Sequence, residues 1–438
     1  MEHAYSLPLY SLLPFILMLG AIAVLPLVAN HFWESNRNKL IIAMILAIPT
    51  AIYLFSAGYS HELSHVVIFD YVPFMVLLGS LFIITGGIHV EGDIEASPKN
   101  NSVYLIIGAV LASFMGTTGA AMLLIRPILQ TNSERKLKAH TVLFFIAIVA
   151  NCGGLLTPLG DPPLFMMYLR GAEFFWFMKL LPEWAFTNFI LIGIYFLVDS
   201  YYIKKELPGD VYFDRTNIKP IKISGRRNFL FLIGVVLGVA FINENTLIFM
   251  RENDYYSFLR EGFLVLMAVL SLMMTKQVTR ENNKFNWGPI VEVAYLFIGI
   301  FVTMVPALEY LKVHAAEIGI NSAAQFYYAT GALSSFLDNT PTALTFYYLE
   351  LGLVTANPML LLKDLQVAGI PEVIMKAIST GAVFFGAMTY IGNGPNFMVK
   401  AIAEEQGIKM PDFFSYMFKF SIIVLLPIYI LVQLLFIG

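Results

Sequence analysis

The sequence is poor in charge, since only 13% of its 438 residues are charged while 58% are apolar. A soluble globular chain has about 25% charged residues, so this composition predicts a protein that lies mainly within a lipid bilayer. The net charge of −3 is small and gives no indication of a nucleic-acid partner. The expected partners are the bilayer itself and small ions.

Cysteine and clustered histidine are also scarce. The single cysteine, Cys152, excludes an intramolecular disulfide and a cysteine-based metal cluster, and we expect it to act as a small buried apolar residue. The seven histidines form no cluster suited to a transition metal, and no cofactor is expected. The first ten residues contain no Lys or Arg, so a signal peptide is not predicted and residues 11–29 are expected to be a retained span.

The sequence contains many long apolar runs. A hydrocarbon layer about 30 Å thick requires roughly 20 apolar residues in each crossing helix. The uninterrupted runs of this kind are 11–29, 40–57, 66–89, 182–202, 228–249, 258–275, 289–311 and 413–436. Four further runs are interrupted by glycine, proline or polar residues, namely 102–130, 140–169, 323–349 and 373–399.

The interrupted runs occur in the same order in two halves of the chain. The segment SFMGTTG, from Ser113, aligns with SFLDNTP, from Ser335, at an offset of 222 residues. The segment PLGDPP, from Pro158, aligns with YIGNGP, from Tyr390, at an offset of 232. The repeated order predicts an internal duplication. Its parts would be a first repeat (1–202), a linker (203–227) and a second repeat (228–438).

The two repeats are predicted to lie in the membrane in opposite orientations. We interpret 102–130 and 323–349 as re-entrant hairpins, whose arms of about 14 residues, or about 21 Å, are too short to cross. Each half then has five spans, including the broken helices 140–169 and 373–399, and an odd number inverts the second half. Seven Lys and Arg residues in 203–227 predict that the linker is cytoplasmic and that both termini lie outside. If each hairpin crossed the membrane instead, the halves would be parallel.

The fold class is therefore an all-α polytopic membrane protein with two inverted-topology repeats, and its four breaks predict a central site. Broken backbone at membrane depth persists only where protein or a cavity surrounds it. Half-helix ends and unwound carbonyl groups then direct partial charges toward one ion or substrate. The candidate ligands carry the oxygen atoms that small cations prefer: Thr117, Thr118, Asn151, Gly153, Thr157, Gly160, Asp161, Asp338, Asn339, Thr340, Asn393 and Asn396.

Each half contributes one carboxylate to these breaks. Two buried carboxylates suit the exchange of H⁺ for Na⁺ or Li⁺, because both compete for the same oxygen atoms. The alternative is helix capping, since Asp161 precedes Pro162 and Asp338 starts the sequence D-N-T-P. The hypothetical Na⁺ site comprises Asp338, Asn339, Thr340 and Asp161.

The motifs NCGGLLTPLGDPP, from Asn151, and SSFLDNTPTALTF, from Ser334, resemble those of the ion transporter superfamily. The resemblance is strongest to NhaD-like sodium:proton antiporters, which are related to arsenite permeases, citrate transporters and divalent-anion/sodium symporters. It implies two inverted halves, a homodimer in the bacterial inner membrane, and Na⁺ binding at hairpin tips with the pattern Ser-Asn-Thr. Asn339 and Thr340 match that pattern, whereas Asp338 replaces its serine. The first half retains only Thr118.

The leading functional prediction is Na⁺/H⁺ exchange by alternating access, without enzymatic activity. The alternatives are a sodium-coupled di- or tricarboxylate transporter or an arsenite efflux permease. More remote readings are a passive channel and an intramembrane aspartyl protease that would use Asp161 and Asp338. The protease motif G-x-G-D is incomplete, because Pro158 occupies its first position.

A few charged residues beside the apolar runs have open roles. Arg126 is expected to pair with a charge, to extend toward the membrane surface, or to hold an anion. We expect His89, Glu91 and Asp93 to form a solvated face where the third span ends, with a pH sensor as the alternative. Glu309 is expected at the membrane interface.

Overall fold

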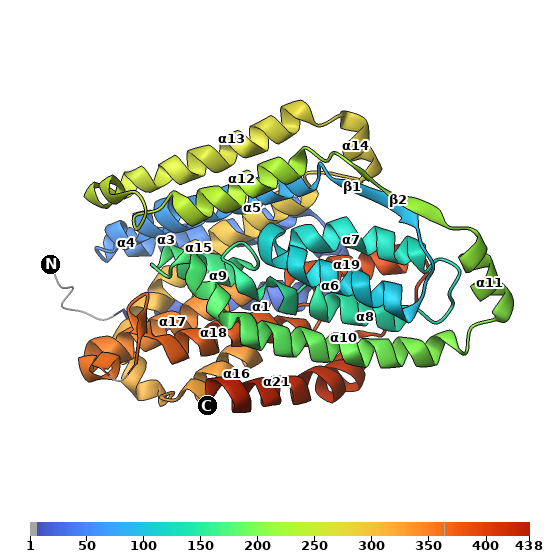
Figure 1. Ribbon diagram of the computed structural model, residues 1–438. Helices are drawn as coiled ribbons and strands as arrows, with labels where there is room; N and C mark the ends of the chain where they lie inside the picture. The colour runs from blue at the N-terminus through green and yellow to red at the C-terminus, as the bar shows by residue number, and fades with distance from the viewer. Residues whose placement is uncertain (1–6, 363) are drawn as a thin grey trace.

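The protein is an almost entirely helical membrane protein, and its long helices run roughly along one common direction (Figure 1). The computed structural model describes residues 7–362 and 364–438. Within these residues, eight helical stretches are long and apolar enough to cross a bilayer: Leu9–Pro26, Asn36–Ser56, Ser60–Thr85, Ala139–Leu156, Phe174–Ile203, Asp254–Met274, Gly288–Ile318 and Phe413–Ile437.

The first half of the chain and the linker contain α1 to α11. In order, the elements are a 3₁₀ turn (Leu9–Leu12), α1 (Leu13–Val28), α2 (Asn30–Trp33), α3 (Asn36–Ser56), α4 (Ser60–His65), a π-helical segment (Val66–Tyr71), α5 (Val72–Thr85), β1 (His89–Asp93), α6 (Pro98–Met115), α7 (Thr117–Thr131), α8 (Ala139–Ile148), a 3₁₀ segment (Cys152–Leu156), α9 (Pro162–Leu169), a 3₁₀ segment (Phe174–Leu180), α10 (Leu181–Ile203), α11 (Pro208–Thr216) and β2 (Lys219–Ser224).

The second half continues to the C-terminus. Its elements are α12 (Asn228–Phe241), two 3₁₀ segments (Ile248–Glu252 and Asp254–Ser257), α13 (Phe258–Met274), α14 (Gln277–Asn282), α15 (Gly288–Ile318), α16 (Ala323–Ser334), α17 (Asn339–Ala356), a 3₁₀ segment (Pro358–Leu362), β3 (Gln366–Val367), β4 (Ile370–Pro371), α18 (Glu372–Phe385), a 3₁₀ turn (Gly386–Met388), α19 (Gly394–Glu405), α20 (Phe413–Tyr416), a π-helical segment (Met417–Leu425), α21 (Leu426–Val432) and a second π-helical segment (Gln433–Ile437).

The third predicted span differs from the structure at both ends. It begins at Ser60 rather than residue 66 and ends at Thr85 rather than residue 89. The following residues form β1, which pairs antiparallel with β2 of the linker, so that Glu91 lies opposite Lys222. Of the predicted solvated face, Glu91 is exposed but Asp93 is buried. The pairing of β1 with β2 therefore attaches the linker to the end of this span.

The predicted span 228–249 is also shorter in the structure, because α12 ends at Phe241. The side chain of Asn243 ends the helix: its Nδ2 donates to the carbonyl of Ala240 at 2.8 Å, and its Oδ1 accepts from the backbone of Asn245 and Thr246. Such local side-chain bonds compete with helix continuation. The helix has 14 residues and is not among the eight candidate spans.

The predicted hairpins correspond to α6–α7 and α16–α17. We call the end of the molecule that carries α11, β1 and β2 the linker end, and the end that carries α4 the far end. In Figure 1 the α6–α7 pair lies toward the linker end, and α17 lies toward the far end. The arms differ in length from the predicted 14 residues, since α6 and α17 each have 18 residues, α7 has 15 and α16 has 12. The inversion of the two halves stays a prediction.

Burial separates inner helices from those that face lipid. In the stretch Ala139–Leu156, 83% of the residues are buried, against 28% in an 18-residue part of Asn36–Ser56. The latter exposes Ile41, Ile45, Ile48 and Ile52, which recur at helical spacing and form an apolar stripe. The broken segments therefore lie within the protein, surrounded by helices such as α3 whose outer faces suit contact with lipid.

Candidate functional site

The carboxylate of Asp161 is enclosed by three uncharged hydrogen-bond donors. Its Oδ1 accepts from the hydroxyl of Thr117 at 2.8 Å and from the amide of Asn393 at 3.3 Å. Its Oδ2 accepts from the amide of Asn339 at 2.8 Å. Asp161 is only 1% exposed. Because these four residues come from the four predicted breaks, all four breaks meet at one carboxylate.

A network of buried asparagines extends from this cage. Asn151 donates to Oδ1 of Asn396 at 2.7 Å and accepts from the amide of Asn393 at 3.1 Å. Asn396 in turn donates to the backbone carbonyls of Gly386 at 2.8 Å and Thr389 at 2.9 Å. The network connects the broken helix of one half to the broken helix of the other, and it satisfies the hydrogen bonds of amide groups that would otherwise be costly to bury.

The same backbone arrangement occurs in both halves. In the first, the hydroxyl of Thr157 donates to the carbonyl of Ser113. In the second, the hydroxyl of Thr389 donates to the carbonyl of Ser335 at 2.5 Å. These residues are related by the offsets of 232 and 222 that align the two halves in sequence. Each threonine therefore holds a broken segment against the tip of its neighbouring helix pair.

Two close approaches explain why glycine occupies the breaks. A Cβ atom on Gly386 would lie 2.6 Å from Oδ1 of Asn339 and 2.8 Å from Oδ1 of Asn151. A Cβ atom on Gly160 would lie 2.0 Å from the carbonyl oxygen of Gly154. Real Cβ atoms do not make contacts this short, so a side chain at either position would push the site apart.

The capping alternative is correct for Asp338 and wrong for Asp161. Asp338 accepts a hydrogen bond from the backbone of Thr340 at 2.9 Å and so caps α17. Asp161 also occupies an N-cap position, with extended backbone, but its side chain makes no capping hydrogen bond. Its carboxylate faces the cage instead. Of the residues proposed for the Na⁺ site, Asn339 and Asp161 are thus joined, whereas Asp338 and Thr340 bond to each other.

The backbone oxygens predicted as ligands are already engaged. The carbonyl of Gly153 accepts from the hydroxyl of Ser113 at 2.5 Å and the indole of Trp184 at 3.0 Å. The carbonyl of Gly160 accepts from the backbone of Thr117 at 2.8 Å. These bonds hold the loop before α9 in place. They leave side-chain oxygens as the better candidates for contact with an ion.

A cavity of about 70 Å³ adjoins the cage. Its lining includes Thr117, Thr118, Gly160 and Pro162, together with apolar residues of α5 and α15. One water needs about 10–15 Å³ by this measure, so the cavity has room for several waters or a partly hydrated cation. Thr118, which does not contact Asp161, thus lines the space beside it.

This cavity leads toward the linker end. It shares Phe82, Thr118 and Pro289 with a second cavity of about 30 Å³. The second cavity shares Lys284 with a third, of about 630 Å³, at the linker end. The smallest of the three is lined by Phe82 and Phe285, whose ring centroids are 5.2 Å apart. Neighbouring cavities therefore follow one another from the site to the linker end.

The wide cavity at the linker end has an excess of positive charge. Arg126 lies in its wall, and within the described chain its buried Nη1 atom has no hydrogen-bond partner. Among the predicted roles of Arg126, a place facing an anion fits this position. The charged side chains in the lining are Arg126, Lys219, Lys222 and Lys284, against Glu91 and Asp93.

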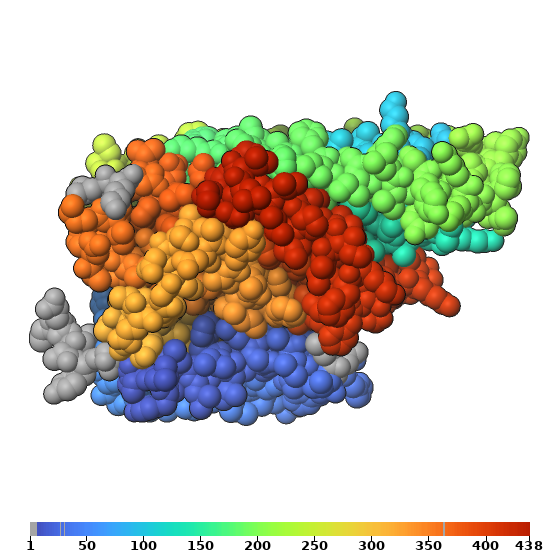
Figure 2. All heavy atoms as spheres, turned by 90° about the horizontal axis from the view of Figure 1, so that it is seen from below, coloured from blue at the N-terminus to red at the C-terminus, as the bar shows by residue number. Residues whose placement is uncertain are grey.

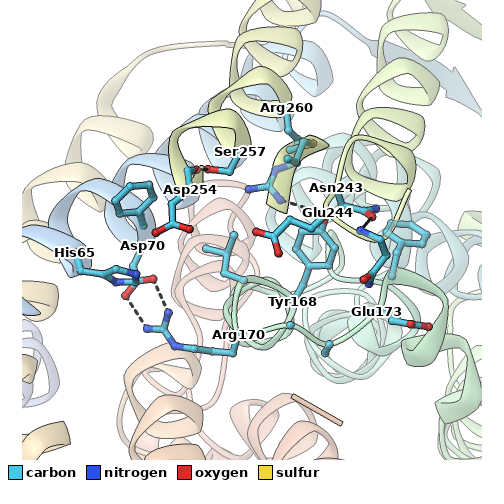
Figure 3. Close-up of a pocket in the computed structure, with 17 residues that line it drawn as sticks. His65, Asp70, Tyr168, Arg170, Glu173, Asn243, Glu244, Asp254, Ser257 and Arg260 are labelled. Atoms are coloured by element: carbon cyan, nitrogen blue, oxygen red, sulfur yellow. Dashed lines mark hydrogen bonds and ion pairs between the residues drawn. The ribbon is translucent and has the colours of Figure 1, made fainter. Parts of the chain in front are cut away.

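A separate cavity of about 280 Å³ lies near the other end of α9 (Figure 3). The guanidinium of Arg170 donates to both carboxylate oxygens of Asp70 at 2.6 Å. Arg260 donates to the hydroxyl of Tyr168 at 3.2 Å and forms an ion pair with Glu261 at 2.5 Å. Figure 3 shows Arg170 directed toward Asp70. Through these contacts α9, which begins beside Asp161, is anchored to α13 and the π-helical segment Val66–Tyr71.

The sequence analysis missed these anchors and a second buried cluster. Asp199, which is fully buried, binds Arg135 at 2.6 Å and His140 at 2.8 Å. Asp70 and Asp199 both lie within apolar runs, and a carboxylate in such a run requires a partner. That signal was present in the sequence, but it does not identify the partner. Glu309, predicted at the interface, pairs with Lys312 at 2.5 Å.

Comparison with known protein families identifies the family of the chain. A family model described as "Putative citrate transport" matches residues 4–437, which is nearly the whole chain. No curated protein matches the chain. The family is part of the ion transporter superfamily that the sequence motifs resemble.

Proposed function

The chain belongs to this citrate-transport family, and from this membership we propose that it is a cation-coupled secondary transporter of a di- or tricarboxylate such as citrate. In this proposal Asp161 binds the coupling cation, which is Na⁺ or H⁺. The carboxylate substrate is bound beside it, at the tips of the two helix pairs. The transporter works by alternating access, with inverted halves and a homodimeric assembly in the bacterial inner membrane.

The observation that carries the proposal is the cage around Asp161. All of the described hydrogen-bond partners of this buried carboxylate are uncharged, and none of them is a Lys, Arg or His side chain. A buried charge without an opposite charge is costly at membrane depth. A bound Na⁺ or H⁺ offsets that cost. An anionic substrate would be repelled by Asp161 until the cation is bound, and this order of events couples the two.

The start of α7 supplies a place for the substrate carboxylate. The N–H groups in the first turn of a helix have no intrahelical acceptor, and the helix dipole adds partial positive charge there. The N–H of Thr117 is taken by the carbonyl of Gly160, but Thr118 and Gly119 follow it in the first turn and line the cavity beside Asp161. The positively charged cavity at the linker end then supports approach of an anion from that side.

A second candidate is Na⁺/H⁺ exchange without an organic substrate. It is favoured by the composition of the cage, because hydroxyl, amide and carboxylate groups suit a small hard cation and no basic side chain among the described residues joins them. The recurrence of the Thr157 and Thr389 hydrogen bonds in both halves supports alternating access under either candidate.

The experiment is transport by the purified full-length protein in proteoliposomes. Uptake of labelled citrate is measured with and without an inward Na⁺ gradient, and then with an imposed pH gradient. Succinate and arsenite are tested as competitors. Citrate uptake driven by either gradient supports the proposal. Na⁺-dependent movement of protons, without uptake of citrate or succinate, instead establishes the exchanger. Neither activity between about pH 6 and 9 rejects both.

A further inference from the structure

A groove of about 860 Å³ lies at the linker end, where it shares Gln406 with the wide cavity but none of the residues around Asp161. It is bounded by the start of α8, the end of α10 and the segment from α19 to the π-helical segment Met417–Leu425. Figure 2 shows the teal part of the chain, which leads into α8, between the green α10–α11 region and the red C-terminal region. The groove therefore opens on the outside of the molecule.

The rim of this groove is positively charged. Lys136, Lys138, Lys409 and Lys419 line it, and the described lining contains no Asp or Glu. Lys138 is engaged by the carbonyls of Asn132 and Ser133, and Lys136 approaches Asp210 at 3.8 Å. By contrast, Lys409 and Lys419 are exposed and form no ion pair with any described residue. These two ammonium groups are available to an anion.

The walls of the groove are apolar. Leu143, Val198, Phe420 and Val424 line it, and they belong to three stretches that are candidate membrane spans, namely Ala139–Leu156, Phe174–Ile203 and Phe413–Ile437. The groove lies at the linker end of all three spans. With these spans in a bilayer, the ammonium groups of the lysines would reach the lipid headgroups, and the apolar walls would face the acyl chains.

We propose that this groove binds an anionic phospholipid, whose phosphate contacts Lys409 and Lys419 and whose acyl chain lies along Leu143, Val198 and Val424. A basic pocket between membrane helices is suited to an anionic headgroup. Both features are needed for this choice, because citrate or free phosphate would use the rim but leave the apolar walls uncovered. The proposal does not depend on which substrate the transporter carries.

The test is native mass spectrometry of the full-length protein in detergent, titrated with phosphatidylglycerol or phosphatidylcholine of the same acyl chains. We expect preferential binding of phosphatidylglycerol. One lysine near a lipid surface contributes about a fivefold change in affinity, so Lys409→Gln with Lys419→Gln should weaken phosphatidylglycerol binding by about 30-fold. A matched control is Lys99→Gln with Lys276→Gln, which removes the same charge from exposed positions outside the groove.

Two further arms identify the ligand. Glycerol phosphate is titrated in place of the lipid, and Val198→Ser with Val424→Ser tests the apolar wall. The proposal requires that glycerol phosphate bind far more weakly than phosphatidylglycerol and that the wall variant lose affinity for the lipid. Equal binding of the two lipids, equal binding of glycerol phosphate, or unchanged binding by the lysine variant would overturn it. Unchanged melting temperatures in lipid-free detergent verify that the variants are folded.

Discussion

Asn339 donates a 2.8 Å hydrogen bond to Asp161, although the two residues lie 178 positions apart in the chain. The bond joins the tip of α17, in the second half, to the start of α9, in the first. Ser334 accompanies it, since its hydroxyl donates to Oδ1 of Asn339 at 2.5 Å. The Asn339 amide that orients the Asp161 carboxylate is thus itself oriented by Ser334, as a preorganised ion site requires.

Asp161→Asn should abolish cation-coupled transport, whereas Asp338→Asn should retain most of it. Asparagine at position 161 removes the negative charge and directs an amide group toward the donor of Asn339. Asparagine at position 338 remains a good helix cap. We expect the initial rate to fall at least tenfold for the first variant and less than threefold for the second. Proteoliposome uptake measures both, and equal loss in the two variants contradicts the role given to Asp161.

Gly386→Ala should impair transport through steric displacement alone. The added methyl group would lie within 2.8 Å of Asn151 and within 2.6 Å of Asn339. Overpacking of this kind typically costs about 1–3 kcal/mol in unfolding free energy. Gly394→Ala is the control, because a Cβ atom there meets nothing within 4 Å. Thermal unfolding and uptake are measured for both, and an active, stable Gly386→Ala protein would show that the amides are not fixed in place.

Removing one partner of the Asp70–Arg170 ion pair should destabilise the protein more than replacing both partners with apolar residues. Asp70→Ala leaves a buried guanidinium unpaired, and removing one partner of a buried pair costs about 3–5 kcal/mol. The double variant Asp70→Leu with Arg170→Leu should be destabilised less than Asp70→Ala. Chemical unfolding of the three proteins decides this, with Lys179→Ala as a control at an exposed ion pair. A double variant that is the least stable would contradict the argument.

Phe285 should restrict access to the site from the linker end. Its ring lies beside Phe82 in the wall of the smallest of the three neighbouring cavities. In Phe285→Ala, a cysteine introduced as Thr118→Cys should react with a small water-soluble thiol reagent at least tenfold faster than in the Phe285 protein. The native Cys152 is buried and gives a low background. The same rate in both proteins would mean that access follows another route.

Mild acid should stabilise the linker end. Burial raises the pKa of the Asp93 and Asp214 carboxyl groups, and nearby Glu134 raises both further. A carboxyl whose pKa is raised in the folded state binds protons more readily there, so stability increases as pH falls toward the raised pKa. We expect a higher melting temperature at pH 5.5 than at pH 7.5. Asp93→Asn with Asp214→Asn should reduce that difference, whereas Glu244→Gln at the far end should not.

The meeting of the four breaks was predictable from the sequence, but their contacts were not. Interrupted apolar runs at matched offsets indicate a central site, because free backbone groups cannot face lipid. The pattern could not show that Asp161 leaves its capping role while Asp338 keeps it. That difference depends on Thr117, Asn339 and Asn393, which reach Asp161 only after the helices are packed.

The sequence predicted which segments are helical better than it predicted the residues at which the helices begin and end. The third span continues back to Ser60 through α4, whose sequence S-H-E-L-S-H is polar, so that the apolar run begins only at residue 66. Likewise, α12 ends early because Asn243 bonds to the local backbone. In both cases the error lies at a polar stretch beside an apolar run, where hydropathy alone does not show whether the helix continues or ends.

The strand pair β1–β2 gives the junction between the two halves a mechanical role. Strand β2 is hydrogen-bonded to β1, which directly follows the third span. The segment before α12 is therefore attached to the first half by hydrogen bonds as well as by the chain itself. A cut between α11 and β2 would leave a C-terminal fragment that begins with its own docking strand. Two separately expressed polypeptides, 1–217 and 218–438, would then find each other through that strand and assemble without a covalent link.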